Sequence, residues 1–266
     1  MRTKAANVRA VANGAITLGA IALGAIVLCS ASARAQSAEV CAVPGYLLFG
    51  DSLLQRVSAA VGKDKALKIV VLGGTSSTLP GPDGANYAYP ARLEATLKRR
   101  LPDVAVAVAA QTKPRRSALE GSESIGKLVL DQKPNLVVWQ TGTNDAVRGS
   151  DLEDFRATVA DGVERLQASG ADVVLVNMQY SPRTELIVAV GAYADSMRWV
   201  AREREVPVFD RLAIMRHWYD AGQFDLYATT KDMTTAKQVH ECLGRALAAL
   251  IIDAARLHAQ DGVTVQ

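Results

Sequence analysis

Two segments of the chain contain serines that could attack a carbonyl carbon. The first is Gly50-Asp51-Ser52-Leu53, and the second is Gly74-Thr75-Ser76-Ser77-Thr78, which follows an apolar run. A serine hydroxyl becomes a useful nucleophile only when a neighbouring base takes its proton. The oxyanion that then forms needs hydrogen-bond donors. A site of this kind therefore requires a donor and a base from elsewhere in the chain.

The segment "VVWQTGTNDAV" offers the donor. An apolar run leads into Gly142-Thr143-Asn144-Asp145, where glycine permits a sharp turn. The Asn144 amide just beyond that turn can donate to an oxygen anion. An Asx-type turn explains the same residues without any chemistry, so the donor role depends on what lies nearby.

Histidine is the expected base, and the chain contains three. His258 lies near the C-terminus, and packing or surface exposure explains His217, which is next to Trp218. His240 stands at the start of the last predicted helix, after an irregular loop, which suits a base that reaches a strand end. Taken alone, a capping or surface role explains His240 better.

These groups need a scaffold that brings distant segments together. Continuous apolar runs of strand length indicate strands covered on both faces, as in parallel sheets; they are Ala66–Leu72, Val104–Ala110, Asn135–Gln140, Ala171–Asn177 and Val206–Phe209. Amphipathic helices are predicted after them, at Tyr89–Leu101, Ser117–Asp131, Leu152–Ala168, Thr184–Glu205 and Gln238–His258. This alternation predicts a doubly wound, mostly parallel, five-stranded α/β sheet with ligands bound at the carboxyl ends of its strands.

A serine after the first strand, G-x-N-D after the third and a histidine at the C-terminal helix resemble the SGNH/GDSL hydrolase family. The resemblance runs from about Lys68 to the last helix, and "VVWQTGTNDAV" is its most specific part. It implies a flavodoxin-like, three-layer α/β/α fold with Ser76 as nucleophile and His240 as base. It also implies an oxyanion hole built from the Ser76 N–H, the Asn144 amide and the N–H of Arg115.

The order of the elements favours Ser76 over Ser52. In the family the nucleophile follows the first core strand, and G-x-N-D follows the third. Counted from Ser76 this order fits, whereas "IVVLG" would be an additional strand if Ser52 were the nucleophile. The segment Gly50–Leu53 is then a turn and a helix cap before "LLQRVSAAV", and Ser77 stays open as a one-residue alternative. Three residues are expected to shape the site: Gly74, Gly142 and Asp145.

Two positions depart from the family pattern. The family commonly has an aspartate three residues before the histidine, but this chain has Lys237, which cannot stabilise an imidazolium. The acidic member therefore stays open among Asp232, Glu241 and Asp51. The second departure is Arg115, which occupies the place of a family glycine. Its backbone N–H can still donate, while its side chain would narrow the site or offer charge to an anionic substrate.

The first 35 residues predict a secretory signal. Three basic residues precede the apolar run "AITLGAIALGAIVLC", and Ala33-Arg34-Ala35 provides a cleavage site. An uncleaved anchor is the alternative, but the run is shorter than the ~20 residues of a membrane span. We expect a periplasmic or secreted protein without a stable membrane anchor. It would consist of an N-terminal segment, residues 36–65, and a hydrolase-like domain, residues 66–266.

Charge and cysteines limit the partners. The leader holds four basic residues and no acidic one, so its removal lowers the formal charge from +3 to −1, which gives no argument for nucleic-acid binding. With Cys29 removed, Cys41 and Cys242 are disulfide candidates in an exported protein, the alternative being two buried thiols. No CxxC or histidine-rich spacing predicts a metal, and we expect no cofactor.

These inferences predict an exported serine hydrolase that cleaves carboxylic esters. The expected substrates are O-acyl groups, specifically O-acetyl groups, of envelope or polysaccharide material. Only the predicted compartment and the family resemblance support this choice of substrate. An O-acyltransferase acting on glycans is an alternative within the enzyme class. A degenerate, non-catalytic glycan-binding domain is the alternative outside it, motivated by Lys237 and Arg115.

Overall fold

A five-stranded parallel sheet forms the centre of the fold. The computed structural model describes residues 41–227 and 233–258. The chain divides into Met1–Cys41 and Ala42–Gln266, and the sheet belongs to the second unit. Its strands are β1 (Ala66–Gly73), β2 (Ala105–Thr112), β3 (Leu136–Gln140), β4 (Asp172–Val176) and β5 (Val208–Phe209). They lie in the order β2-β1-β3-β4-β5, and every pair is parallel, so the predicted doubly wound α/β sheet is confirmed.

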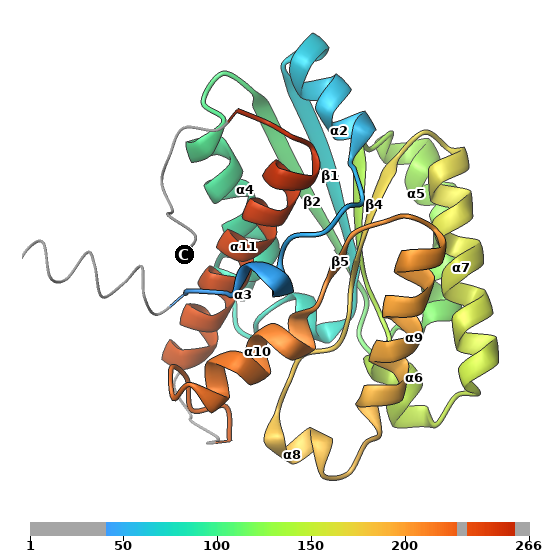
Figure 1. Ribbon diagram of the computed structural model, residues 1–266, viewed down its shortest axis with the longest axis vertical. Coiled ribbons are helices and arrows are strands. Elements are labelled where there is room, and N and C mark those ends of the chain that lie inside the picture. Colours follow the sequence, from blue (N-terminus) through green and yellow to red (C-terminus); the bar gives the residue numbers. More distant parts are fainter. Residues whose placement is uncertain (1–40, 228–232, 259–266) are drawn as a thin grey trace, which may run out of the picture. The chain divides into compact units, whose positions relative to one another are not determined.

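Helices cover both faces of this sheet (Figure 1). Helices α4 (Tyr89–Arg100) and α11 (Thr234–Ala254) pack against each other on one face. Helices α5 (Ala118–Gln132), α7 (Leu152–Ala168) and α9 (Val190–Glu203) form the layer on the other. The shorter helical segments are η1 (Gly45–Leu47), α2 (Gln55–Ala59), η2 (Ala60–Asp64), η3 (Thr75–Ser77), α3 (Gly84–Tyr87), α6 (Thr143–Arg148), α8 (Pro182–Glu185) and α10 (Arg211–Asp220).

The central strands are unbroken apolar runs because they lie in the core of the fold. All five residues of β3 are buried, as are four of the five in β4, because helices cover both of their faces. Strand β2 differs, since most of its residues are exposed or half-exposed. The prediction that every apolar strand is covered on both faces is therefore wrong for β2, which lies at the edge of the sheet.

Two helix predictions also need correction. The predicted helix Thr184–Glu205 is two helices, α8 and α9, because Ala189 has a non-helical backbone with ψ 58°. The last helix begins at Thr234 rather than Gln238, so His240 lies in its second turn and not at its start. The predicted leader, residues 1–35, lies outside the described residues.

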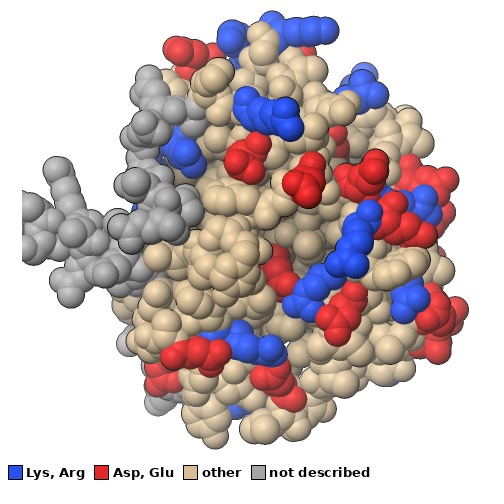
Figure 2. Space-filling model, in the orientation of Figure 1, with Lys and Arg blue, Asp and Glu red and all other residues tan. Residues whose placement is uncertain are grey.

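The register aligns the carboxyl ends of the strands. Leu72 pairs with Trp139, Gln140 with Val176, and Val176 with Phe209. Residues that directly follow these strands are therefore brought to one edge of the sheet, as expected for open α/β folds. No helix in the described part of the chain is both long and apolar enough to cross a membrane. On the face shown in Figure 2, acidic and basic side chains are interspersed.

Candidate functional site

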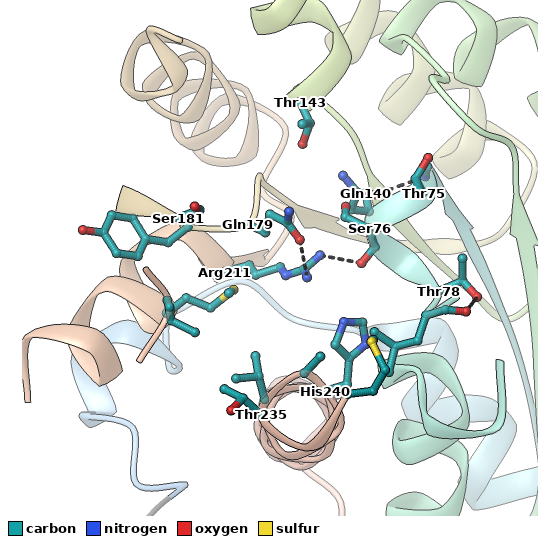
Figure 3. A pocket seen from close by; sticks show the side chains of 18 of the residues that line it. Thr75, Ser76, Thr78, Gln140, Thr143, Gln179, Ser181, Arg211, Thr235 and His240 are labelled. Carbon is teal, nitrogen blue, oxygen red and sulfur yellow. Dashed lines mark hydrogen bonds between the residues drawn. The ribbon is translucent and has the colours of Figure 1, made fainter. Parts of the chain in front are cut away.

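A cavity of about 510 Å³ opens at the carboxyl edge of the sheet. Its walls come from the segments that follow β1, β3, β4 and β5, together with helix α11. Four residues predicted for the site line it: Gly74, Ser76, Asn144 and His240. Segments more than 160 residues apart in the sequence thus meet at one place, and the view in Figure 3 looks into it.

The two adjacent serines after β1 have different surroundings. Ser77 is only 1% exposed, and its hydroxyl lies 3.0 Å from Gln140 Oε1 and 3.0 Å from the Tyr89 hydroxyl. Because an amide oxygen can only accept, Ser77 donates to Gln140 and accepts from Tyr89. Ser76 is half-buried and lines the cavity. The Ser77 hydroxyl is thus committed to the interior, and Ser76 presents the accessible one.

Glycine is required where β1 passes into this turn. A Cβ on Gly73 would lie 2.3 Å from Ser77 Oγ, so only glycine fits above the buried serine. Gly74 N–H donates to Gln140 Oε1 at 3.1 Å, which ties the turn to the end of β3. The next residues form the one-turn helix η3, whose first N–H groups have no intrahelical partner. The Ser76 N–H is one of these groups.

Asn144 lies beside that turn, since a Cβ on Gly74 would be 3.7 Å from Asn144 Nδ2. Its Nδ2 donates to the Arg116 carbonyl at 3.1 Å, which leaves the second hydrogen of the amide for a ligand. The turn that presents it needs Gly142, whose φ is +95° and whose added Cβ would lie 2.6 Å from Met178 Sδ. Gly142 therefore shapes the site through backbone conformation and packing.

Asp145 supports the site from below and does not line the cavity. It is 4% exposed, and both carboxylate oxygens accept from the Ala118 N–H, at 3.0 and 3.2 Å. Burial raises the pKa of Asp145, with these backbone donors opposing the effect. Its role is to hold the start of α5 beside the G-x-N-D turn.

His240 is 5% exposed, and its Nδ1 accepts from the Tyr89 N–H at 2.9 Å. Tyr89 is the first residue of α4, so the histidine satisfies a donor that the helix leaves unpaired. Since Nδ1 accepts, the neutral ring carries its proton on Nε2. Burial and the nearby Arg211 lower the pKa of His240 to about 3. The ring thus faces the cavity as a neutral hydrogen-bond donor.

Neither of the two described acidic candidates, Glu241 and Asp51, hydrogen-bonds His240. Glu241 forms an ion pair with Arg92 at 3.6 Å and does not line the cavity. Asp51 lies in a separate groove, and Asp232 lies outside the described residues. Lys237, at the family's aspartate position, places its Nζ 3.9 Å from the centre of the Tyr87 ring. Among the described residues, the group that hydrogen-bonds His240 Nδ1 is thus a backbone amide and not a carboxylate.

The position aligned with the family glycine keeps a glycine-like backbone. Arg115 has φ +56°, a left-handed conformation that glycine adopts most readily. Its side chain is exposed and is absent from the cavity lining, so it does not narrow the site. The neighbouring Arg116 lines the cavity instead.

Sequence reasoning missed Arg211, which lines the same cavity. It lies two residues after the end of β5, so the rule used at the other strand ends would have found it. Asp210 and Asn177 hold this segment in place: Asn177 Nδ2 donates to Asp210 Oδ1 at 2.7 Å, and Asn177 Oδ1 accepts from the Leu212 N–H at 2.9 Å. Gln140, a further polar residue of the lining, was also missed.

The better-spelled serine, Ser52, lies elsewhere. It lines a second groove of about 730 Å³ near the end of α9, and no described histidine lines that groove. Ser52 was expected to cap the following helix, but it does not. Helix α2 begins at Gln55 after Leu54, which makes no side-chain capping bond.

Two remaining predictions concern cysteines and metals. Cys41 and Cys242 are both disulfide-bonded, as predicted. Within residues 41–227 and 233–258, no group of three or more His, Cys, Asp or Glu side chains is arranged to hold a metal ion.

Comparison with known proteins agrees with this architecture. The sequence pattern of the Non-GDSL lipase-like family matches residues 40–257. No curated protein matches the chain. Three solved structures share the fold at low sequence identity. The acetylxylan esterase Axe2 from Geobacillus stearothermophilus has a TM-score of 0.56 at 18% identity, over 70% of this chain and 94% of the other.

The other two structures are similar to the same extent. LAE5, an alpha/beta hydrolase from the metagenome of Lake Arreo, Spain, has a TM-score of 0.55 at 20% identity, over 72% of this chain and 96% of the other. A lipase/acylhydrolase from Enterococcus faecalis has a TM-score of 0.51 at 21% identity, over 67% of this chain and 96% of the other. At these identities the likeness establishes the fold alone.

Proposed function

This chain belongs to the Non-GDSL lipase-like family, and we therefore propose that it is an exported serine hydrolase of carboxylic esters. One observation carries the proposal: an accessible serine, a buried histidine and a carboxamide line one cavity at the carboxyl edge of a parallel sheet. These are Ser76, His240 and Asn144. The three side-chain types are those needed for nucleophilic attack, proton transfer and oxyanion stabilisation.

In the proposed reaction Ser76 Oγ bonds to the ester carbonyl carbon, and its proton passes to His240. The oxyanion accepts hydrogen bonds from the Ser76 N–H and from Asn144 Nδ2, with the Arg115 N–H as a further candidate donor; each donor contributes about 3 kcal/mol to lowering the barrier. The C–O bond to the alcohol then breaks, and His240 returns the proton to the leaving oxygen. Water releases the acyl group from Ser76 by the reverse steps.

Proton transfer requires a change at His240. The ring can accept a proton at Nε2 only as the Nδ1–H tautomer, which is incompatible with the hydrogen bond from the Tyr89 N–H. Giving up that bond costs about 1–3 kcal/mol, the penalty of leaving a buried donor unpaired. We infer that substrate binding supplies this energy.

The substrate part of the proposal is an O-acyl glycan, with O-acetyl as the expected group, encountered in the periplasm or outside the cell. The predicted leader supports the compartment. An acetylxylan esterase is among the proteins with this fold, which makes acetylated xylooligosaccharides a suitable first substrate. The cavity volume of about 510 Å³ is within the ~300–1,000 Å³ usual for small-molecule sites.

Covalent labelling tests the nucleophile directly. The purified protein is treated with a fluorophosphonate probe, and the labelled peptide is mapped by mass spectrometry, alongside hydrolysis of 4-nitrophenyl acetate. We expect a single label on Ser76. Ser52→Ala is the matched control, because Ser52 lies in the other groove, and it should be labelled like the wild type. Labelling at Ser52 or Ser77, or undiminished hydrolysis by Ser76→Ala, would refute the assignment.

A second candidate function is a non-catalytic domain that binds acylated glycans. The observation that favours it is the His240 ring, which presents an N–H to the cavity and has a backbone amide where a carboxylate would orient a base. Such a domain would bind acetylated xylooligosaccharides in calorimetry without releasing acetate and without reacting with the fluorophosphonate.

A further inference from the structure

Arg211 is a buried cation that has no acidic partner among the described residues. Its side chain belongs to the most buried large groups of the chain, at 1% exposure, yet it lines the cavity. Nη1 donates to the Ser76 carbonyl at 2.9 Å, and Nη2 lies 3.3 Å from Gln179 Oε1. In Figure 3 the side chain extends between these two residues. Both partners are neutral, and so is the Tyr89 ring, whose centroid lies 5.6 Å from Arg211 Cζ. No carboxylate of the described chain therefore balances the charge.

The neighbouring arginines show the usual arrangement. Asp210, the residue just before Arg211, accepts from Arg198 Nε at 2.6 Å, so the nearest acid in sequence is committed elsewhere. Arg216, on the same helix as Arg211, pairs with Glu185. Burial lowers the pKa of Arg211 to about 10, which leaves the guanidinium charged at neutral pH. A buried charge without a partner is costly, and here it is held at the wall of an open cavity.

Other groups on the cavity wall are donors as well. Thr141 and Thr143 line the cavity, and their buried hydroxyls have no hydrogen-bond partner among the described residues. The neutral His240 ring adds its Nε2–H, and Asn144 adds a free amide hydrogen. The described lining contains one carboxylate, Asp225; it is exposed, and its Oδ1 accepts from the Tyr227 N–H.

We propose that the cavity recognises an oxyanion, a carboxylate or a phosphate, on its ligand, and that Arg211 is the residue that binds it. A guanidinium with free hydrogens suits such groups because it can donate to two oxygens at once. If the chain hydrolyses esters as proposed above, the anion lies close to the ester bond, because Arg211 contacts the carbonyl of the nucleophilic residue itself. The substrate class then narrows to acidic esters, such as the acyl esters of acidic sugars.

Paired substrates test this specificity. We compare kcat/KM at constant ionic strength for neutral 4-nitrophenyl acetate and for two acidic esters: 4-nitrophenyl hydrogen succinate, with its carboxylate on the acyl side, and 2-acetoxybenzoate, with its carboxylate on the alcohol side. We expect Arg211→Gln to lower kcat/KM for at least one acidic ester at least tenfold more than for the neutral ester. Arg216→Gln removes the same charge from the same helix, where Glu185 already pairs with it, and should change this ratio less than twofold. Arg211→Lys should lie between the wild type and Arg211→Gln.

A binding measurement separates this proposal from the proposed function. Calorimetric titration of the wild type with succinate, inorganic phosphate and neutral succinamide needs no catalysis, and it also shows which oxyanion is preferred. We expect saturable binding of succinate or phosphate, none of succinamide, and at least tenfold weaker anion binding in Arg211→Gln. If the protein binds anions in this way but hydrolyses no ester, the proposed hydrolase function is wrong and the proposed anion site stands. Absence of anion binding by the wild type, or equal loss for acidic and neutral esters in Arg211→Gln, would overturn the anion site. If Arg211→Gln does not fold, the wild-type titration decides alone.

Discussion

The backbone N–H of Tyr89 donates to Nδ1 of His240 over 2.9 Å, so the only described histidine in the cavity also caps the first turn of α4. The positive end of the α4 dipole disfavours a protonated ring there, in the same direction as burial and Arg211. His240 is thereby kept neutral with its proton on Nε2.

The buried neutral histidine makes stability depend on pH. The pKa of His240 is about 3 in the folded chain and 6.5 in the unfolded chain, so below pH 6.5 the unfolded state binds a proton that the folded state does not. The free energy of unfolding should fall by up to about 1.4 kcal/mol per pH unit from pH 6.5 toward 3. In His240→Asn, an amide oxygen can replace Nδ1 as acceptor for Tyr89 and does not titrate. Urea denaturation at pH 7.5, 6 and 5 should show a shallower decline for this variant; parallel declines would contradict the prediction.

The two adjacent serines should separate activity from stability. Ser76→Ala should lower kcat for 4-nitrophenyl acetate at least about a thousandfold, with the free energy of unfolding changed by less than about 0.5 kcal/mol. Ser77→Ala leaves the buried Tyr89 hydroxyl without its acceptor and should cost about 1–3 kcal/mol of stability. Chemical denaturation and initial rates on the same preparations provide the comparison. The reverse pattern would identify Ser77 as the nucleophile.

Asn144 should act on the rate and not on substrate binding. Asn144→Ala removes a donor expected to meet the oxyanion only as it forms, so kcat should fall by about 10²–10³ while KM stays within a few-fold. The lost bond to the Arg116 carbonyl is a single side-chain contact worth about 1 kcal/mol. Thermal unfolding of the variant is the control. A fall in kcat below tenfold would remove Asn144 from the oxyanion hole.

The disulfide predicts both the number of reactive thiols and a loss of stability when the bond is removed. If the predicted leader is removed after Ala35, the remaining chain contains two cysteines, Cys41 and Cys242. Under denaturing conditions it should show no reactive thiol before reduction and two after. The bond spans about 200 residues of chain, so in the chain-entropy account its removal costs up to about 5 kcal/mol. Cys41→Ser combined with Cys242→Ser should therefore unfold at lower urea. Two free thiols in the unreduced protein would contradict the disulfide.

The pattern of residues was sufficient for much of the architecture. Buried parallel strands consist of apolar residues along their whole length, so their positions were visible in the sequence, with boundaries shifted by one or two residues. The edge position of β2 could not be predicted from the sequence, because its alanines and valines are also typical of a strand covered on both faces. The break before α9 was not predicted either, because it depends on the non-helical backbone of Ala189.

For the site, the sequence by itself determined the residue types and the strand ends that carry them: Ser76 after β1, Asn144 after β3 and His240 on the last helix. The tertiary structure alone decided which of two adjacent serines is accessible, because the burial of Ser77 depends on Gln140 and Tyr89 from other elements. It also decided the state of the His240 ring and the isolation of the Arg211 charge. Hydrogen-bond partners and burial arise from segments distant in sequence, and no local pattern encodes them.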